Sequence, residues 1–148
     1  MDDIRRQIVI AAGDEDLGAG DFVGAVGENE NDEKLSPYVK PVKRGLDTLQ
    51  QATLWLAQHG VQNPNDAGAG AVDYLRMMGI VVVAWMWARM AKVAQAKLAA
   101  GSGNKEFYEG KLVSARYWME RLIPECPMLF ERIQAGSATI MAFEPATA

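Results

Sequence analysis

Hydrophobic residues are densest in one stretch of the chain, residues 71–100. Within this stretch, residues 77–88 carry no charge, and their only side-chain hydrogen-bonding groups are the indoles of Trp85 and Trp87. An Ala-, Lys- and Gln-rich run follows, and its helix propensity together with the length of the segment favours a helix over a buried strand. A helix that is apolar nearly all round in its first half needs neighbours on most sides. We therefore expect the rest of the chain to pack around residues 71–100.

Two details of this predicted helix stay open at the level of sequence. Gly79 either allows another helix to approach closely or is a tolerated glycine that costs about 1 kcal/mol relative to alanine. Trp85 and Trp87 are two positions apart, so they point in different directions on a helix. Both could belong to the core, or one could face a second subunit or another domain, where tryptophan is enriched.

A membrane span is not expected from this stretch. Its uncharged run ends at Arg89, and Lys92 and Lys97 follow. Crossing the hydrocarbon core takes about 20 consecutive apolar residues. The sequence therefore predicts a buried core helix.

Two helices are predicted before the apolar stretch. Residues 2–12 carry an apolar stripe too short to be stable alone in water, so this helix must dock on another element. The other begins at Ser36-Pro37, with the serine as N-cap, unless Pro41 moves the start to about residue 40. It runs to His59, and Gly60 is its expected stop. Its apolar stripe consists of Val42, Leu46, Leu49, Thr53 and Leu56.

A further helix is predicted after the apolar stretch. It begins at Lys105 with Asn104 as its cap, and Pro124 ends or kinks it. Helix then resumes over residues 128–135 until Gly136 stops it, and residues 137–142 add one turn. The apolar stripe of the helix that begins at Lys105 consists of Tyr108, Leu112, Ala115, Met119 and Leu122.

The connections complete the predicted architecture. Residues 13–35 read as a flexible acidic, Gly-rich connector, and residues 61–70 as a turn in which Asp66 caps the next helix. No strand pair or hairpin signal is present, and short connections make consecutive helices antiparallel. We expect an all-α, up-down four-helix bundle with the long connector between its first and second helices. Residues 1–148 form a single helical domain whose bundle body is 36–142.

Composition and charge narrow the class of protein. The 148 residues suit one domain with a sizeable core, and 49% apolar with 23% charged residues is ordinary for a globular protein. A single cysteine, Cys126, excludes an internal disulfide framework. Residues 1–34 hold ten acids and three bases, while the remainder holds nine acids and twelve bases. This basic excess is too small to indicate nucleic acid, although an anionic ligand or an acidic neighbouring domain would be compatible with it.

No constellation of catalytic residues is visible. The only histidine, His59, reads as a helix C-terminal residue that serves the last carbonyls, and Cys126 has no base beside it. Tyr74, Arg76, Arg116 and Tyr117 could bind an anion, but polar tips at the rim of a core are the better interpretation. We predict no catalytic, no cofactor-binding and no metal-binding residue in this chain. The residues alone indicate a binding, packing or assembly module.

A series of short segments from about residue 37 onwards carries a family resemblance through its order and spacing. These segments are residues 46–57, 74–79, 85–91, Phe107-Tyr108, Lys111-Leu112, 115–121, Pro124-Glu125, 133–136 and 139–142. Together they resemble the C-terminal extension of a subgroup of acyl-CoA dehydrogenases. The subgroup comprises the larger bacterial enzymes that include the 3-methylthiopropionyl-CoA dehydrogenases.

The resemblance implies a function that the whole enzyme performs and this chain does not. Enzymes of this family bind FAD and remove two hydrogens from the α and β carbons of an acyl-CoA thioester, with a glutamate that takes the α proton. Those parts precede the extension, so no such role transfers to Glu106, Glu109, Glu120 or Glu125. The chain would be a non-catalytic C-terminal accessory domain of a cytoplasmic, oligomeric flavoprotein of fatty acid metabolism. Its partners would be the catalytic body of the same dehydrogenase or another subunit.

Two expectations separate this reading from its alternative. An excised domain leaves its interface bare, so an exposed apolar patch is expected where the catalytic body docks. The alternative is a free-standing helical adaptor or homodimeric interaction module, which would use a closed two-fold interface.

Overall fold

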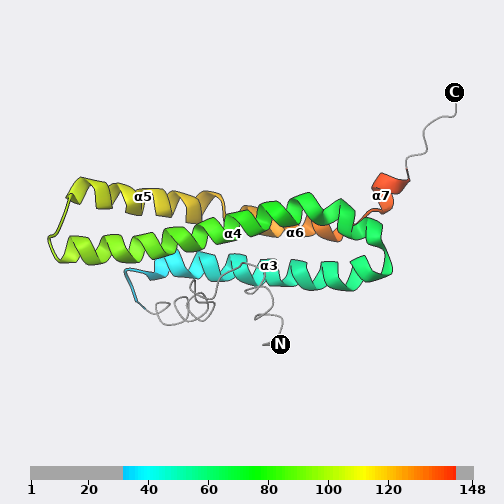
Figure 1. Ribbon diagram of the computed structural model, residues 1–148, viewed down its shortest axis with the longest axis horizontal. Helices are drawn as coiled ribbons and strands as arrows, with labels where there is room; N and C mark the ends of the chain where they lie inside the picture. The colour runs from blue at the N-terminus through cyan, green and yellow to red at the C-terminus, as the bar shows by residue number, and fades with distance from the viewer. Residues whose placement is uncertain (1–31, 143–148) are drawn as a thin grey trace, which may run out of the picture.

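The computed structural model describes residues 32–142, and within that range every regular element is a helix. The predicted all-α class is therefore confirmed for this part of the chain. The predicted helix 2–12 and the connector up to residue 31 lie outside the described residues. The elements, labelled as in Figure 1, are α3 (Ser36–Gln62), α4 (Pro64–Ala99), α5 (Lys105–Arg121), α6 (Glu125–Gln134) and α7 (Ala138–Met141).

The helices are arranged as three long rods, of which the third is broken. α3 and α4 run antiparallel side by side, as the bond from the Gln95 amide to the Lys34 carbonyl at one end shows (2.7 Å). α5 then returns along the C-terminal half of α4, and α6 continues in the same direction along its N-terminal half (Figure 1). The Trp118 indole donates to the carbonyl of Ile80 at 3.1 Å, near the middle of α4.

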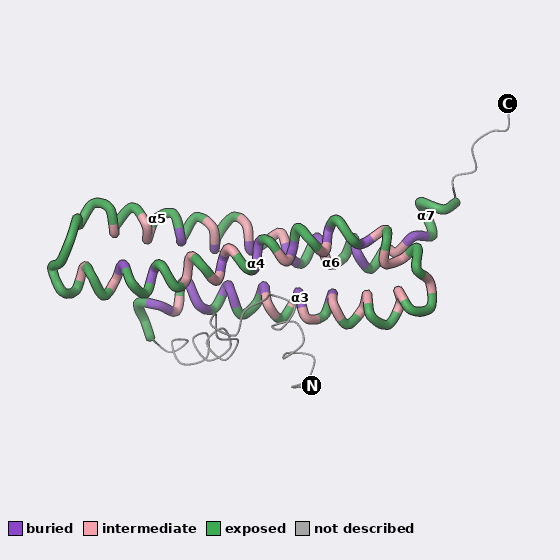
Figure 2. Tube along the Cα trace, in the orientation of Figure 1, coloured by how far each residue is buried: buried purple, intermediate pink, exposed green. Residues whose placement is uncertain are grey.

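The core follows the seam between these rods. Buried residues line the facing sides of α3, α4 and the α5–α6 rod (Figure 2). The largest fully buried side chains are Met77, Met119, Leu129, Ile133, Val42, Val81 and Cys126. Val42 and Met119 belong to the predicted stripes, and Met77 and Val81 belong to the predicted apolar stretch. Hydrophobic burial of about 25 cal/mol per Å² of apolar area is what holds the rods together.

The connection between α3 and α4 differs from the prediction. Gly60 does not stop α3, and residues 61–70 are not a turn, because helix resumes at Pro64 after one extended residue, Asn63. A residue before proline favours the extended region, and proline suits the first position of a helix. The Asn63 side chain caps α4 by accepting from the backbone N–H of Asn65 at 3.2 Å.

Gly60 has a packing role in place of the predicted stop. A Cβ at this position would lie 3.0 Å from the Cβ of Ala67, on the first turns of α4. The glycine thus permits the two helices to approach closely just before the chain reverses. His59 does serve a carbonyl near the end of α3, because its Nδ1 lies 2.9 Å from the backbone oxygen of Trp55.

The start of α3 also differs in detail. The N-cap position is occupied by Leu35, and no side chain caps the helix there. The carbonyl of Asp32 accepts from the backbone N–H of Ser36 at 2.7 Å instead. Pro41 lies buried inside α3, so it does not move the start to residue 40.

The predicted cap, break and stop in the second half of the chain are confirmed, although helix resumes at Glu125 rather than at the predicted residue 128. Asn104 caps α5 by accepting from the N–H of Phe107 at 3.1 Å. Pro124 lies in the break between α5 and α6, and α6 ends before Gly136, whose φ of 64° lies in the left-handed region that favours glycine. The predicted extra turn after Gly136 is α7.

Candidate docking surface

α4 leaves one apolar face uncovered by the described residues. We call this surface the α4 outer face: Val72, Leu75, Gly79, Val82, Met86, Met90 and Val93. Its side chains lie on the far side of the helix from the buried Met77, Val81 and Ala84. Leu75 keeps 69% of its surface exposed and Val72 77%. The expectation that this helix has neighbours on most sides is therefore wrong for the described part of the chain.

Gly79 lies in the middle of the outer face and carries no side chain, so the apolar stripe has a gap there, which we call the hollow at Gly79. Nothing lies within 4 Å of the position that a Cβ would take there. No described helix approaches at this point, so Gly79 does not allow close packing between two described helices of this chain. The glycine still leaves the backbone accessible to a group from outside.

The two tryptophans lie half-buried on the flanks of the outer face. The guanidinium carbon of Arg89 is 5.0 Å from the centroid of the Trp85 ring. On the other flank, the ammonium of Lys111 is 5.7 Å from the Trp87 ring and 5.2 Å from the ring of Phe107, which is itself exposed. Such contacts between a cation and an aromatic ring hold the basic groups beside the apolar stripe.

The charges that α4 presents to solvent are basic. Its two acids are held against α6 and the segment after it. The carboxylate of Asp73 is 3.0 Å from the Arg132 guanidinium, and Asp66 accepts from the backbone N–H and the hydroxyl of Ser137 at 2.8 and 2.6 Å. The hydrogen bonds from Ser137 hold the pKa of Asp66 below its usual value.

The candidate anion-binding cluster does not form. The Tyr74 hydroxyl pairs with that of Thr53 at 2.8 Å, and Arg76 is joined to Glu125 at 2.6 Å. Arg116 pairs with Glu120 on its own helix at 2.9 Å. Each of these groups is satisfied by a different partner, and Tyr117 is exposed. Their role is that of polar groups at the edge of the core.

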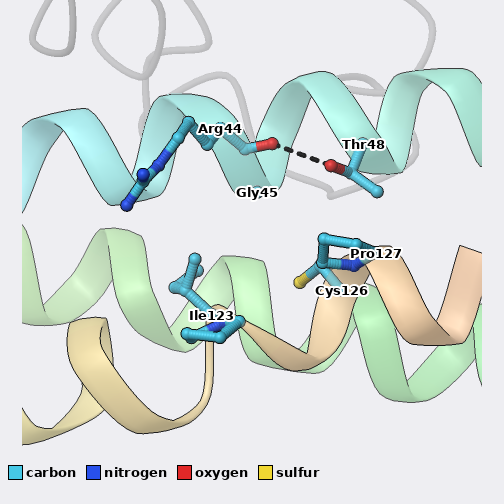
Figure 3. Close-up of a pocket in the computed structure, with 7 residues that line it drawn as sticks. Arg44, Gly45, Thr48, Ile123, Cys126 and Pro127 are labelled. Carbon is cyan, nitrogen blue, oxygen red and sulfur yellow. Dashed lines mark hydrogen bonds between the residues drawn. The ribbon is translucent and has the colours of Figure 1, made fainter.

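A small pocket lies between α3 and the α5–α6 break (Figure 3). Its volume is about 240 Å³, and it is lined by Arg44, Gly45, Thr48, Ile123, Pro124, Cys126 and Pro127. The Cys126 side chain is buried. This burial, and to a lesser extent the negative charge of the neighbouring Glu125, raises the pKa of the thiol to about 11. The thiol is protonated at neutral pH, so it is not a nucleophile there.

The described residues form no further cluster that resembles a metal-binding site. No three of their His, Cys, Asp and Glu side chains gather as metal ligands would. By length and composition alone, α4 could also cross a membrane. One such helix is weak support for a span, because the core helix of a water-soluble protein meets the same criteria.

Comparison with known proteins identifies the family to which this helical domain belongs. The family model described as "Acetyl-CoA dehydrogenase C-terminal like" matches residues 19–144. A broad-specificity linear acyl-CoA dehydrogenase of Mycobacterium tuberculosis is 30% identical over 70% of this chain, and the match covers 17% of that protein. A 3-methylmercaptopropionyl-CoA dehydrogenase of Ruegeria pomeroyi is 36% identical over 60% of this chain, a match that covers 14% of that protein. The chain thus spans about a sixth of the length of these relatives, and it belongs to the family of acetyl-CoA dehydrogenase C-terminal-like domains.

Proposed function

We propose that this chain is the C-terminal assembly domain of a flavin-dependent acyl-CoA dehydrogenase and that the α4 outer face docks on the catalytic body of that enzyme. The observation that carries the docking proposal is the contiguous apolar stripe left bare on the most apolar helix. Monomeric proteins rarely expose such stripes unless they mark an interaction site. Because the chain spans about a sixth of its relatives' length, the catalytic body is the natural occupant.

In this proposal the whole enzyme, a cytoplasmic flavoprotein, carries FAD and the acyl-CoA substrate, and the present chain supplies no reacting group. The domain comprises residues 1–148, with its body over 36–142. Its contribution is geometric, since a helical bundle fixed to the catalytic body can shape the assembly of subunits. The alternative, a free-standing adaptor, would use the same outer face for a second copy or another protein.

The size of the native protein tests the first part of the proposal. An immunoblot of source cells with an antibody against the bundle is expected to give a band several times larger than the 16.2 kDa of this chain. A band at the size of the chain would support the free-standing adaptor. The isolated chain is also expected to purify without flavin absorbance and without dehydrogenation of acyl-CoA.

The docking itself is tested in the full-length dehydrogenase with a matched pair of variants. Leu75→Asp places a charge on the outer face, whereas Val113→Asp places one on α5, and the two native side chains are 69% and 70% exposed. Leu75→Asp is expected to undock the domain, so that limited proteolysis releases it faster and gel filtration shows altered assembly. Val113→Asp is expected to behave as wild type. Equal behaviour of the two variants would show that the outer face is not the docking surface.

A further inference from the structure

We propose that the element seated on the α4 outer face is an α-helix with an apolar stripe, acidic flanks and a large side chain that enters the hollow at Gly79. This inference rests on the proposed function and specifies the chemistry of the partner surface. It commits to one occupant, and a second copy of this chain is an outcome that the experiment can detect.

The spacing of the outer face points to a helix as the occupant. Successive positions, from Val72 to Val93, are separated by three, four, three, four, four and three residues. The average spacing is therefore 3.5 residues, close to the repeat of a coiled-coil seam, although two successive steps of four, from Val82 to Met90, interrupt the strict alternation of three and four. A partner helix that follows this seam crosses α4 at a shallow angle of about 20°.

The hollow at Gly79 adds a requirement on the size of one partner residue. The outer-face residues on either side of it, Leu75 and Val82, both carry branched side chains, and the position between them is open. Coiled-coil packing inserts a knob from one helix into a space between residues of the other. A large apolar side chain of the partner fills this space better than a small one, because a void at the interface forfeits contacts.

The charges beside the apolar stripe indicate which charged residues flank the stripe of the partner helix. Arg89, Lys97 and Lys111 form what we call the basic rim, and none of the three pairs with an acid among the described residues. Arg89 and Lys111 lie against the ring systems on the two flanks, and Lys97 continues the stripe one turn beyond Val93. Acidic residues on the partner helix would pair with this rim, and flanking charges set partner choice in helix pairs.

Charge disfavours the second copy as occupant. The two acids of α4 are engaged with Arg132 and Ser137, so they cannot neutralise the rim of another molecule without breaking those contacts. Two copies docked in parallel would bring the two basic rims together, and like charges at an interface oppose association. In an antiparallel pair each rim would face the N-terminal half of the other α4, whose two acids are already engaged.

The experiment measures binding of defined helical peptides to the full 148-residue chain. The probes are two synthetic peptides of about 21 residues, three heptads, with leucine at the seam positions and either glutamate or lysine at the flanking positions. Isothermal titration calorimetry at low salt is expected to show about tenfold tighter binding of the glutamate peptide, a preference that shrinks as salt is added. Gly79→Phe fills the hollow and is expected to weaken binding of this peptide, while Gly110→Phe, at an equally open glycine of α5, leaves it unchanged.

Each outcome has a defined meaning. Equal binding of the two peptides, or tighter binding of the lysine peptide, would overturn the acidic partner and leave docking through the outer face intact. Binding unaffected by Gly79→Phe would overturn the inserted side chain. If neither peptide binds while Leu75→Asp still undocks the full enzyme, the partner is not such a helix; if both experiments are negative, the proposed function fails as well. Sedimentation that shows a dimer of this chain, converted to monomer by Met86→Asp, would assign the face to a second copy.

Discussion

At the scale of single residues, two glycines in neighbouring helices have opposite surroundings, and alanine at each should have opposite effects. A Cβ at Gly45 of α3 would lie 2.9 Å from Ile123 Cδ1 and 3.2 Å from Val81 Cγ2, whereas Gly79 is open. Overpacking a core costs about 1–3 kcal/mol, while alanine in a helix gains about 1 kcal/mol over glycine. In urea unfolding, Gly45→Ala is expected to lower the free energy of unfolding by ~1 kcal/mol and Gly79→Ala to raise it by roughly 0.5–1 kcal/mol.

The two substitutions change the same atoms in the same type of element, so each is the control of the other. Equal effects would mean that α3 and the α5–α6 break shift apart without cost, and that Gly45 does not set their distance. That distance also defines the pocket of Figure 3, which Gly45 lines.

The thiol of Cys126 provides a second test at the residue scale. Its pKa of about 11 and its burial predict slow reaction with thiol reagents in the native state. An ordinary cysteine has a pKa of about 8.5, so the lower thiolate fraction alone slows reaction by roughly two orders of magnitude. Labelling with a disulfide reagent at pH 8, with and without urea, measures the ratio of the labelling rates of the unfolded and the folded chain. Fast labelling of the folded chain would show that the pocket exposes a usable thiol.

At the scale of elements, Asp66 fastens the first turn of α4 to the connection between α6 and α7. Because hydrogen bonds from Ser137 lower its folded-state pKa, the carboxylate contributes stability above its unfolded pKa of about 3.9. This contribution is lost as the pH falls through the lower folded-state value. We expect Asp66→Asn to lower the melting temperature at neutral pH, with a difference from wild type that shrinks below about pH 4.

Thermal unfolding followed by circular dichroism across pH 2 to 7 measures this difference. Asp47→Asn is a suitable control, because Asp47 is an exposed acid of α3 with no ion pair among the described residues. A difference between Asp66→Asn and wild type that stays constant with pH would show that folding does not lower the pKa of Asp66, so that its charge does not contribute to the Ser137 contacts.

Local sequence signals predicted elements well wherever the cause of the structure is local. Asn104 caps the next turn of its own helix, Pro124 breaks helix by its ring geometry, and Gly136 adopts a left-handed backbone. The predictions for Gly60 and Asp66 are wrong because the role of each residue depends on a residue in another element. Gly60 makes room for Ala67, and Asp66 serves Ser137, which lies 71 residues away.

The α4 outer face could not be predicted from local sequence signals either, because it depends on where the other helices lie. The sequence correctly identified the most apolar helix, and its composition predicted neighbours on most sides. Composition carries no information on how many neighbours the chain provides, so the bare side of α4 emerged only with the positions of α3, α5 and α6. The regular spacing of three and four from Val72 to Val93 was visible in the sequence and is the signal that could have located the face.

At the scale of the whole molecule, the isolated chain should behave as a folded domain with an open interface. The bare stripe predicts that the native chain binds a hydrophobic dye such as ANS, as surfaces with exposed apolar patches do. Leu75→Asp should reduce the native-state dye fluorescence because it interrupts the stripe, whereas Val113→Asp should change it little. Both native side chains are about equally exposed, so both substitutions should alter the free energy of unfolding by no more than about 0.5 kcal/mol.

The stability measurement makes the dye result decisive. If Leu75→Asp lowered both dye binding and stability, the side chain would belong to the fold rather than to an interface. If dye binding fell with stability unchanged, the apolar residues of the outer face would be dispensable for folding of the domain. Residues that a domain exposes at no benefit to its own stability are best explained by a surface that a partner covers, as the proposed docking requires.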